Sequence, residues 1–137
     1  MYLYSVTLSQ ATAINQVVYG SFTKAHTHEV AVAKGKILEV YRPDDTTNKL
    51  KLVYSQEIFG LIRQIAPFRL MGMNKDFLVV GSDSGRIVIL EFDTERNQFI
   101  KIHQETFGKT GARRIVPGEF LATDPKGRAI MIGACEK

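Results

Sequence analysis

Two glycines with an aspartate between them stand in the stretch VVGSDSGRIVILEFD, residues 79–93. Such spacing could belong to a loop whose backbone N–H groups hold a phosphate. A P-loop, however, continues through Gly-Lys-Ser/Thr into a helix, whereas Gly81 and Gly85 are too close together and Arg86 stands where the lysine would be. A dinucleotide-binding turn needs a third glycine and a following helix. The residues after Arg86 are β-branched and apolar, so neither type of ligand loop fits.

The same stretch fits a β-hairpin. Short apolar runs at 77–80 and 86–92 are typical of two buried strands. Between them, Gly81, Asp83 and Gly85 form a structural turn, because glycine tolerates a positive φ and aspartate can bond its own backbone.

A second candidate for chemistry is the His-x-His-Glu run formed by His26, His28 and Glu29. Two histidines two positions apart on a strand face the same side, which is an arrangement a metal could use. No third or fourth ligand has a suitable spacing, and His103 is far along the chain. We therefore expect a solvated loop here and no metal.

The remaining reactive side chains do not assemble a catalytic site. Asp44 and Asp45 follow Pro43, and a turn explains both carboxylates. Cys135 lacks a local nucleophile motif and fits a small buried residue on a strand. Because no spacing brings together a nucleophile, a base and an orienting group, we expect no enzyme, no cofactor and no small-molecule substrate.

Composition sets the broad class. The chain has 137 residues, 45% of them apolar, which suits one compact domain or a fragment of a larger one. One cysteine and no signal peptide favour an intracellular protein. No apolar run approaches the ~18–20 residues of a membrane span. The net charge of +4 is mild, so it permits an RNA-rich environment without indicating RNA binding.

The hairpin belongs to a repeat. Residues 29–60 align with residues 76–108, and a third copy starts at 124–137. Each complete copy has an apolar strand, a glycine turn, a second apolar strand, a polar loop and a strand that ends in Phe-Gly. A period near 50 residues built only from strands is typical of propeller blades. The approximate blades are 13–60, 61–108 and, in part, 109–137.

The pattern within each copy predicts an all-β fold, a β-propeller of four-stranded blades that is WD40-like without WD signatures. The middle strands (30–33, 37–40, 77–80 and 87–90) are nearly continuous apolar runs, so we expect both of their faces to be buried. The last strand alternates, with Leu50 and Leu52 between lysines, as at a half-solvated outer rim.

The innermost strands are expected at 61–70 and 114–123. Pro67 and Pro117 interrupt them and must lie at strand ends or bulges. Turns are expected at 42–45 and at 124–127.

Two blades and part of a third cannot close a ring, which needs typically 4–8 blades. A strand expected at residues 2–8 precedes the first blade, as if it completed the last blade of the ring. We therefore interpret the chain as the N-terminal part of the first propeller of a longer protein. A small closed barrel that uses all these strands, acting as an autonomous RNA-binding protein, is the alternative.

Several segments together resemble one family. They are MYLYSVTLSQATAI, GKILEVYRPD, VVGSDSGRIVILEF, KIHQETFGKTGARRIVPGEFLATDPKGRA and MIGACEK. They resemble the large β-propeller subunits of splicing factor 3b (Rse1/SAP130 type, subunit 3), part of the U2 small nuclear ribonucleoprotein. The resemblance covers the whole chain and is most specific over 101–128. Ala112 replaces an expected cysteine and Glu119 an expected glutamine; 23–29 and 71–74 also differ, mostly in predicted loops, as in a divergent orthologue.

The resemblance implies a nuclear, non-catalytic scaffold that supports branch-site recognition and spliceosome assembly in pre-mRNA splicing. Its partners would be the HEAT-repeat subunit and the small subunits of splicing factor 3b, with U2 proteins nearby and RNA touched mostly indirectly. The wider superfamily leaves two other functions open, an adaptor of a ubiquitin ligase and a component of the cleavage and polyadenylation machinery.

One basic cluster is a candidate contact site. Lys109, Arg113 and Arg114 gather in the segment that joins the second and third blades. A solvated rim loop, a contact to an acidic partner surface and a contact to RNA phosphates all fit these residues. Direct RNA contact is the least favoured, since no aromatic side chains for stacking accompany them.

Overall fold

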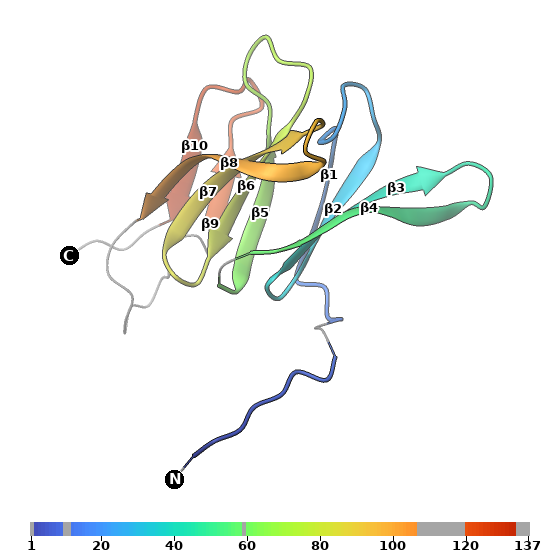
Figure 1. Cartoon of the computed structure of the whole chain (residues 1–137). Coiled ribbons are helices and arrows are strands. Elements are labelled where there is room, and N and C mark those ends of the chain that lie inside the picture. The colour runs from blue at the N-terminus through green and yellow to red at the C-terminus, as the bar shows by residue number, and fades with distance from the viewer. Residues whose placement is uncertain (1, 10–11, 59, 107–119, 134–137) are drawn as a thin grey trace.

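The computed structural model describes residues 2–9, 12–58, 60–106 and 120–133. Within these ranges the chain forms ten strands in three antiparallel sheets that stand side by side (Figure 1). None of these residues belongs to a helix that could cross a membrane.

Each complete sheet is a four-stranded meander in which spatial order follows chain order. Sheet 1 consists of β1 (Gln16–Gly20), β2 (Glu29–Lys34), β3 (Ile37–Asp44) and β4 (Lys49–Glu57). Sheet 2 consists of β5 (Ile62–Phe68), β6 (Phe77–Ser82), β7 (Arg86–Asp93) and β8 (Gln98–Thr106). Sheet 3 contains β9 (Phe120–Thr123) and β10 (Ile130–Gly133). Separate sheets of this kind confirm the predicted all-β fold with four-stranded sheets, and they do not form the single closed barrel of the alternative.

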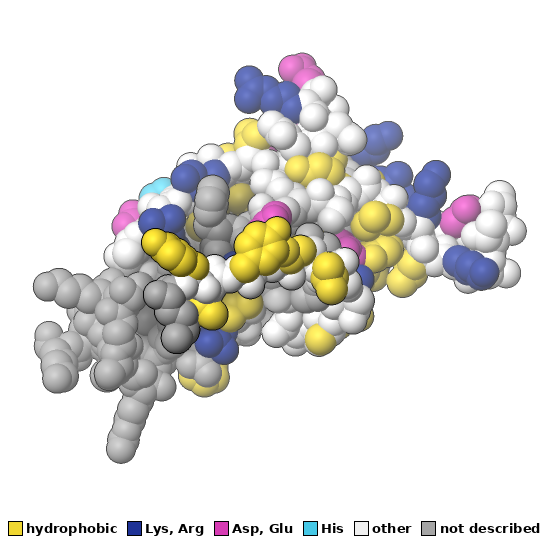
Figure 2. Space-filling model, turned by 60° about the horizontal axis from the view of Figure 1, so that its bottom comes forward, with side chains coloured by type: hydrophobic (Ala, Val, Ile, Leu, Met, Phe, Trp, Pro, Cys, Tyr) yellow, Lys and Arg dark blue, Asp and Glu magenta, His cyan; other side chains and the backbone are white. Residues whose placement is uncertain are grey.

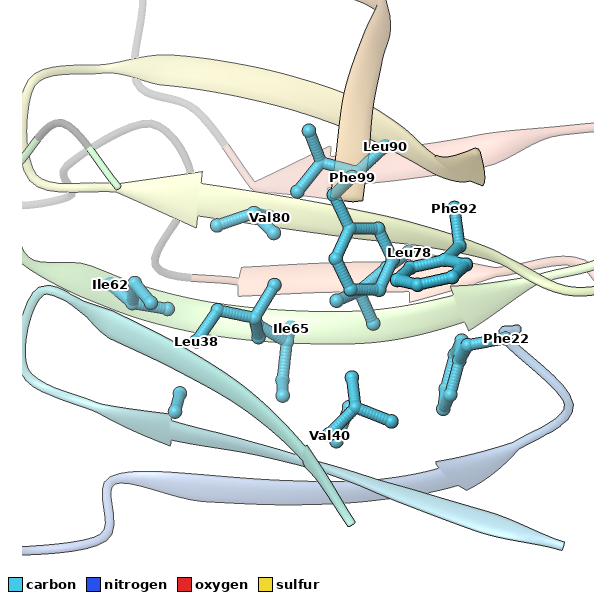
Figure 3. Packing of buried hydrophobic residues seen from close by; sticks show 12 residues of the cluster. Phe22, Leu38, Val40, Ile62, Ile65, Leu78, Val80, Leu90, Phe92 and Phe99 are labelled. Atoms are coloured by element: carbon cyan, nitrogen blue, oxygen red, sulfur yellow. The ribbon is translucent and has the colours of Figure 1, made fainter. Parts of the chain in front are cut away.

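The core lies between the sheets. Successive residues of β6 point to opposite faces, so Leu78 and Val80 pack toward sheet 1 while Phe77 and Val79 pack toward sheet 3. Figure 3 shows the first of these clusters, with Leu38 and Val40 of sheet 1 facing Ile65 and Leu78 of sheet 2. Because each such side chain gains roughly 1.5–3 kcal/mol on full burial, stacking against both neighbours stabilises sheet 2.

Burial of the middle strands agrees with the sequence only in part. All residues of β6 are buried, as predicted. In β3, however, buried positions alternate with partly exposed ones, so the prediction that both faces are buried is wrong for this strand. In β7, Ile87 is buried toward sheet 3 and Leu90 toward sheet 1, as predicted, while Val88 and Ile89 between them are partly buried. The outer face of β3 is partly exposed because no described residues cover that face of sheet 1.

Local irregularities fall close to their predicted places. Pro67 lies one position from the end of β5, an edge strand, where no ladder hydrogen bond needs its missing N–H. The turn expected at 42–45 begins later, because β3 continues through Pro43 to Asp44. At 124–127 the turn is closed by a hydrogen bond of 2.9 Å from the Gly127 N–H to the Asp124 carbonyl.

Residues 2–8 form no strand and are exposed; they extend away from the sheets (Figure 1). A strand exists only when it pairs with a neighbour. The neighbour expected for this segment is the last blade of a ring, which is not among these residues, so ring closure by residues 2–8 stays a prediction.

Candidate interaction site

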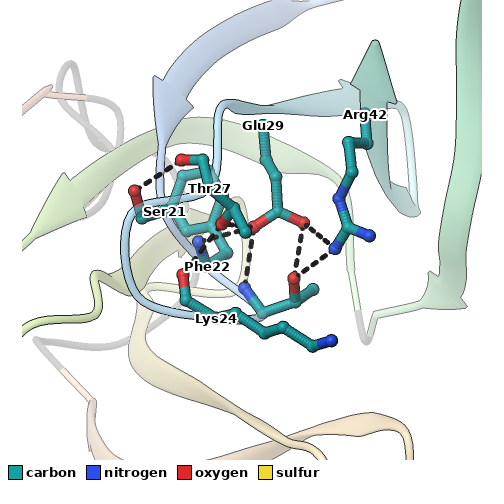
Figure 4. Close-up of polar contacts among 7 residues, drawn as sticks. Ser21, Phe22, Lys24, Thr27, Glu29 and Arg42 are labelled. Carbon is teal, nitrogen blue, oxygen red and sulfur yellow. Dashed lines mark hydrogen bonds and ion pairs between the residues drawn. The ribbon is translucent and has the colours of Figure 1, made fainter. Parts of the chain in front are cut away.

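The loop between β1 and β2 is built around one buried carboxylate. Glu29, at the start of β2, has no exposed surface and accepts hydrogen bonds from the backbone N–H groups of Phe22 (3.0 Å) and Thr23 (2.9 Å) (Figure 4). The hydroxyls of Thr23 and Thr27 each donate to it at 2.6 Å, and the Arg42 guanidinium lies 3.1 Å away. The carboxylate therefore fixes the whole loop onto sheet 1.

Ionisation of Glu29 results from opposing effects. Burial disfavours the charged form and by itself would raise the pKa. Hydrogen bonds from Thr23 and Thr27, and the contact with Arg42, outweigh burial, so the pKa of Glu29 lies below its ordinary value. The folded protein holds this group as a carboxylate at neutral pH.

The metal hypothesis finds no support in this geometry. His28 stands against Tyr19, with its Nδ1 hydrogen-bonded to the tyrosine hydroxyl, while Glu29 is saturated by protein donors. His26 lies in the loop with a positive φ of 57°. No group of three or more candidate metal ligands occurs in the part of the chain that the structure describes. The expectation of a solvated loop is wrong for Glu29, because its side chain faces inward.

A second carboxylate joins this loop to sheet 2. Asp76, which precedes β6, accepts a hydrogen bond of 2.8 Å from the Ser21 N–H and donates its own N–H to the Ser21 carbonyl at 2.7 Å. Arg69 binds both oxygens of the same carboxylate, at 2.8 and 3.1 Å. The loop of one sheet is thus held by the next.

Two glutamines connect the inner strands in a similar way. Gln16 of β1 accepts a hydrogen bond of 2.8 Å from the Ile65 N–H in β5. Gln64 of β5 accepts from the Leu121 N–H in β9 at 2.7 Å and donates to the Leu121 carbonyl at 3.1 Å. Neither glutamine is predicted above as a contact residue, although their spacing of 48 positions matches the repeat.

The predicted turn lies where expected, but its aspartate acts differently. Gly85 has a φ of 78° and its N–H donates to the Ser82 carbonyl at 3.2 Å. Asp83 does not bond its own turn: its carboxylate accepts from the Leu61 N–H (3.0 Å), and its N–H donates to the Leu61 carbonyl (2.9 Å). Gly81 is buried within β6 and pairs with Gln64 and Ile87, so the prediction that it belongs to the turn is wrong: the strand continues to Ser82. The two Asp83 contacts with Leu61 anchor the hairpin to the segment before β5.

Other candidates have local roles or lie outside the described residues. Asp44 accepts hydrogen bonds from the hydroxyl (2.7 Å) and the N–H (3.0 Å) of Thr46, which lower the pKa of Asp44 and account for it as a turn residue. Of the residues singled out in the sequence, five lie outside the described ranges: Lys109, Arg113, Arg114, Pro117 and Cys135.

The outer face of sheet 1 is open and partly apolar. Val17 and Tyr19 of β1 point away from sheet 2 and are 51% and 61% exposed. On β4, Leu50 and Leu52 are exposed as well. Figure 2 shows exposed hydrophobic side chains beside the projecting β3–β4 hairpin, among lysine and arginine side chains. Val17, Tyr19, Leu50 and Leu52 are thus apolar side chains that the described residues leave uncovered.

Comparison with known proteins decides the family. The protein-family model described as the RSE1/DDB1/CPSF1 first beta-propeller matches residues 13–137 of this chain. The chain belongs to this family. The two four-stranded sheets and the two-stranded sheet 3 therefore belong to an RSE1/DDB1/CPSF1 first propeller.

Relatives within this family are similar over the whole chain. The chain is 61% identical to spliceosome-associated protein 130 A of Arabidopsis thaliana and 57% identical to splicing factor 3B subunit 3 of Danio rerio. It is 56% identical to the pre-mRNA-splicing factor RSE1 of Mycosarcoma maydis. In each case all of this chain is covered, and it spans 11% of the length of the relative.

Proposed function

We propose that this chain is the N-terminal part of the first propeller of a non-catalytic scaffold subunit of the splicing factor 3b complex, within the U2 small nuclear ribonucleoprotein. The observation that carries the proposal is the identity of 56–61% with splicing proteins over the full chain. A nuclear location and a role in spliceosome assembly follow from that complex.

The use of polar side chains supports a scaffold. The carboxylates of Glu29 and Asp76 accept hydrogen bonds from backbone N–H groups of a loop. The side-chain amide of Gln64 accepts a hydrogen bond from the backbone of a neighbouring strand. Groups that brace a frame in this way are not poised for proton transfer or nucleophilic attack. A rigid frame that presents loops to partners is what a scaffold requires.

Ring closure is part of the proposal. The open apolar face of sheet 1 would receive the last blade of the same propeller, to which residues 2–8 would add a strand. In this arrangement the blades are approximately 13–60, 61–108 and, in part, 109–137.

Partners are proposed at the level of the complex. The HEAT-repeat subunit and the small subunits of splicing factor 3b would contact the rims, and RNA would be touched mostly indirectly. The segment with Lys109, Arg113 and Arg114 is the proposed contact, because its positive charge suits an acidic protein surface.

Affinity purification of the endogenous full-length protein, tagged at its N-terminus, tests the proposal. We expect splicing factor 3b subunits and U2 proteins to co-purify. Recovery of cullin-containing ligase subunits, or of polyadenylation factors, in their place would move the chain to another branch of the family.

A charge reversal tests the proposed contact segment. Arg113→Glu combined with Arg114→Glu is expected to deplete at least one partner from the purified complex. Lys49→Glu combined with Lys51→Glu, at exposed positions on β4, is the control with the same charge change. An unchanged complex in the first variant would remove this segment from the interface.

A further inference from the structure

A groove of about 180 Å³ separates the outer parts of sheets 1 and 2. One wall is the end of β4 and the residue after it. The other wall is the face of β6, β7 and β8 that is turned toward sheet 1. Its lining residues are Gln56, Glu57, Ile58, Val80, Ser82, Arg86, Val88, Leu90, Phe99, Lys101 and Gln104.

The floor of the groove is apolar and held in place. Val80, Leu90 and Phe99 are buried beneath it, and Val88 is partly exposed to it. The Phe99 ring is fixed by an edge-on contact with Phe92, whose ring centre lies 5.3 Å away. Because these side chains already pack into the core between the sheets, an entering apolar group would meet a preformed surface.

Three cations lie at or near the mouth of the groove. Arg86 and Lys101 are exposed at its sheet 2 side, and Lys36 borders an adjoining cavity that shares Glu57 and Ile58 with the groove. Lys101 donates a hydrogen bond of 2.8 Å to the neutral Gln104. Within the described ranges, none of the three cations forms an ion pair, and Glu57 is the one carboxylate among the lining residues.

We propose that this groove binds an extended acidic segment of a partner protein, with one aliphatic or aromatic side chain inserted between the two sheets. A cavity of about 150 Å³ accommodates a benzene ring, so the volume suits one such side chain. Carboxylates flanking it would face Arg86 and Lys101. The free edge of β8, which pairs only with β7 among the described residues, offers backbone groups to an extended chain.

The observations favour a peptide over RNA. Sequence-tolerant RNA binding uses exposed aromatic rings on which bases stack. The one aromatic ring in the groove, that of Phe99, is 4% exposed and offers no face to a base. The inference concerns the groove itself and does not depend on which complex the protein joins.

Fluorescence anisotropy with the purified full-length protein tests binding directly. The probe is a fluorescein-labelled octapeptide, Asp-Glu-Asp-Leu-Phe-Asp-Glu-Asp. We expect saturable binding that weakens about tenfold with Lys101→Glu and again with Arg86→Glu, since each reversal replaces an attraction by a repulsion. Lys49→Glu, an exposed lysine at the far end of β4, makes the same charge change away from the groove and is expected to leave the Kd unchanged. Both groove positions are exposed, and a thermal melt checks that each variant is folded.

Three further measurements separate the competing explanations. A peptide with alanine in place of Leu-Phe must bind more weakly; equal binding would mean general charge attraction and would overturn the proposal. Competition by a single-stranded oligouridylate that abolishes peptide binding would assign the surface to RNA instead. In the native complex, a carbodiimide is expected to crosslink Lys101 to an aspartate or glutamate of a partner, and a complex with crosslinks at Lys49 but none at Lys101 would also contradict the proposal.

Discussion

Ser21 and Asp76 hold each other across two sheets by a reciprocal pair of hydrogen bonds. The Ser21 N–H donates to the Asp76 carboxylate at 2.8 Å, and the Asp76 N–H donates to the Ser21 carbonyl at 2.7 Å. A side chain at the neighbouring Gly20 would come within 2.8 Å of the same carboxylate, so glycine there leaves room for the pair. A loop of one blade is in this way fixed by the residue that precedes the second strand of the next.

Removal of this carboxylate is expected to loosen the contact between the blades. Asp76→Ala should lower the free energy of unfolding of the propeller by about 2–3 kcal/mol, because a largely buried Ser21 N–H loses its acceptor and Arg69 loses its partner. Denaturant unfolding of the full-length protein measures this. Asp76→Asn keeps one acceptor oxygen and should cost less; equal losses for the two variants would show that the hydrogen bond to Ser21 contributes nothing.

The lowered pKa of Glu29 should make the stability of the folded protein depend on pH. Its pKa in the folded protein is below the ordinary value of 4.5, so its contribution is complete above that value and is lost as the pH falls through the lower folded pKa. Glu29→Gln should therefore cost about 2–4 kcal/mol at neutral pH and show a shallower loss of stability in acid than the parent protein. Unfolding free energies measured from pH 7 down to about pH 3 test both statements.

The exposed Glu95, in the β7–β8 turn, provides the control for this titration. Glu95→Gln should leave the acid limb of the stability profile unchanged. Parallel profiles for the parent and for Glu29→Gln would mean that Glu29 is not held as a carboxylate by its loop.

Local features of this fold could be predicted from the sequence. The turn at Gly85 follows from glycine between two apolar runs, and the burial of Leu78 and Val79 follows from a continuous apolar strand. Both depend on a few neighbouring residues, and the repeat then predicts how the strands are grouped.

Long-range polar contacts could not be predicted. Asp83 could have bonded its own turn, and only the fold brings the Leu61 backbone within reach. In the same way, no periodicity indicates that the Gln64 amide meets a strand 57 residues away. What the sequence does hold is spacing: Gln16 and Gln64 occupy equivalent places in successive copies of the repeat.

The turn between β6 and β7 requires a backbone conformation at Gly85 that would strain most other residues. Gly85 has a φ of 78°, a conformation that β-branched residues strongly disfavour. Gly85→Val should destabilise the propeller by about 1–3 kcal/mol, and Gly85→Asn should cost less because asparagine tolerates this region. Thermal melts of the two variants measure the difference, and an unchanged melting temperature for Gly85→Val would show that the turn does not need a positive φ.

The Gln64 side chain joins the inner strands β5 and β9. It makes two hydrogen bonds with the backbone of Leu121, whereas Gln16 makes one with Ile65. Gln64→Ala should therefore cost about 1–3 kcal/mol of unfolding free energy, and Gln16→Ala roughly half as much. Denaturant unfolding of the full-length protein measures both losses.

Gln64→Glu separates the two bonds of this side chain. The new carboxylate still accepts from the Leu121 N–H, but its second oxygen faces the Leu121 carbonyl, which is also an acceptor. We expect a loss of stability at neutral pH that diminishes as the pH falls and the glutamate becomes protonated, since a protonated carboxyl can donate to the carbonyl again. A loss that stays constant from pH 7 to about pH 4 would mean that the side chain at this position does not meet both backbone groups of β9.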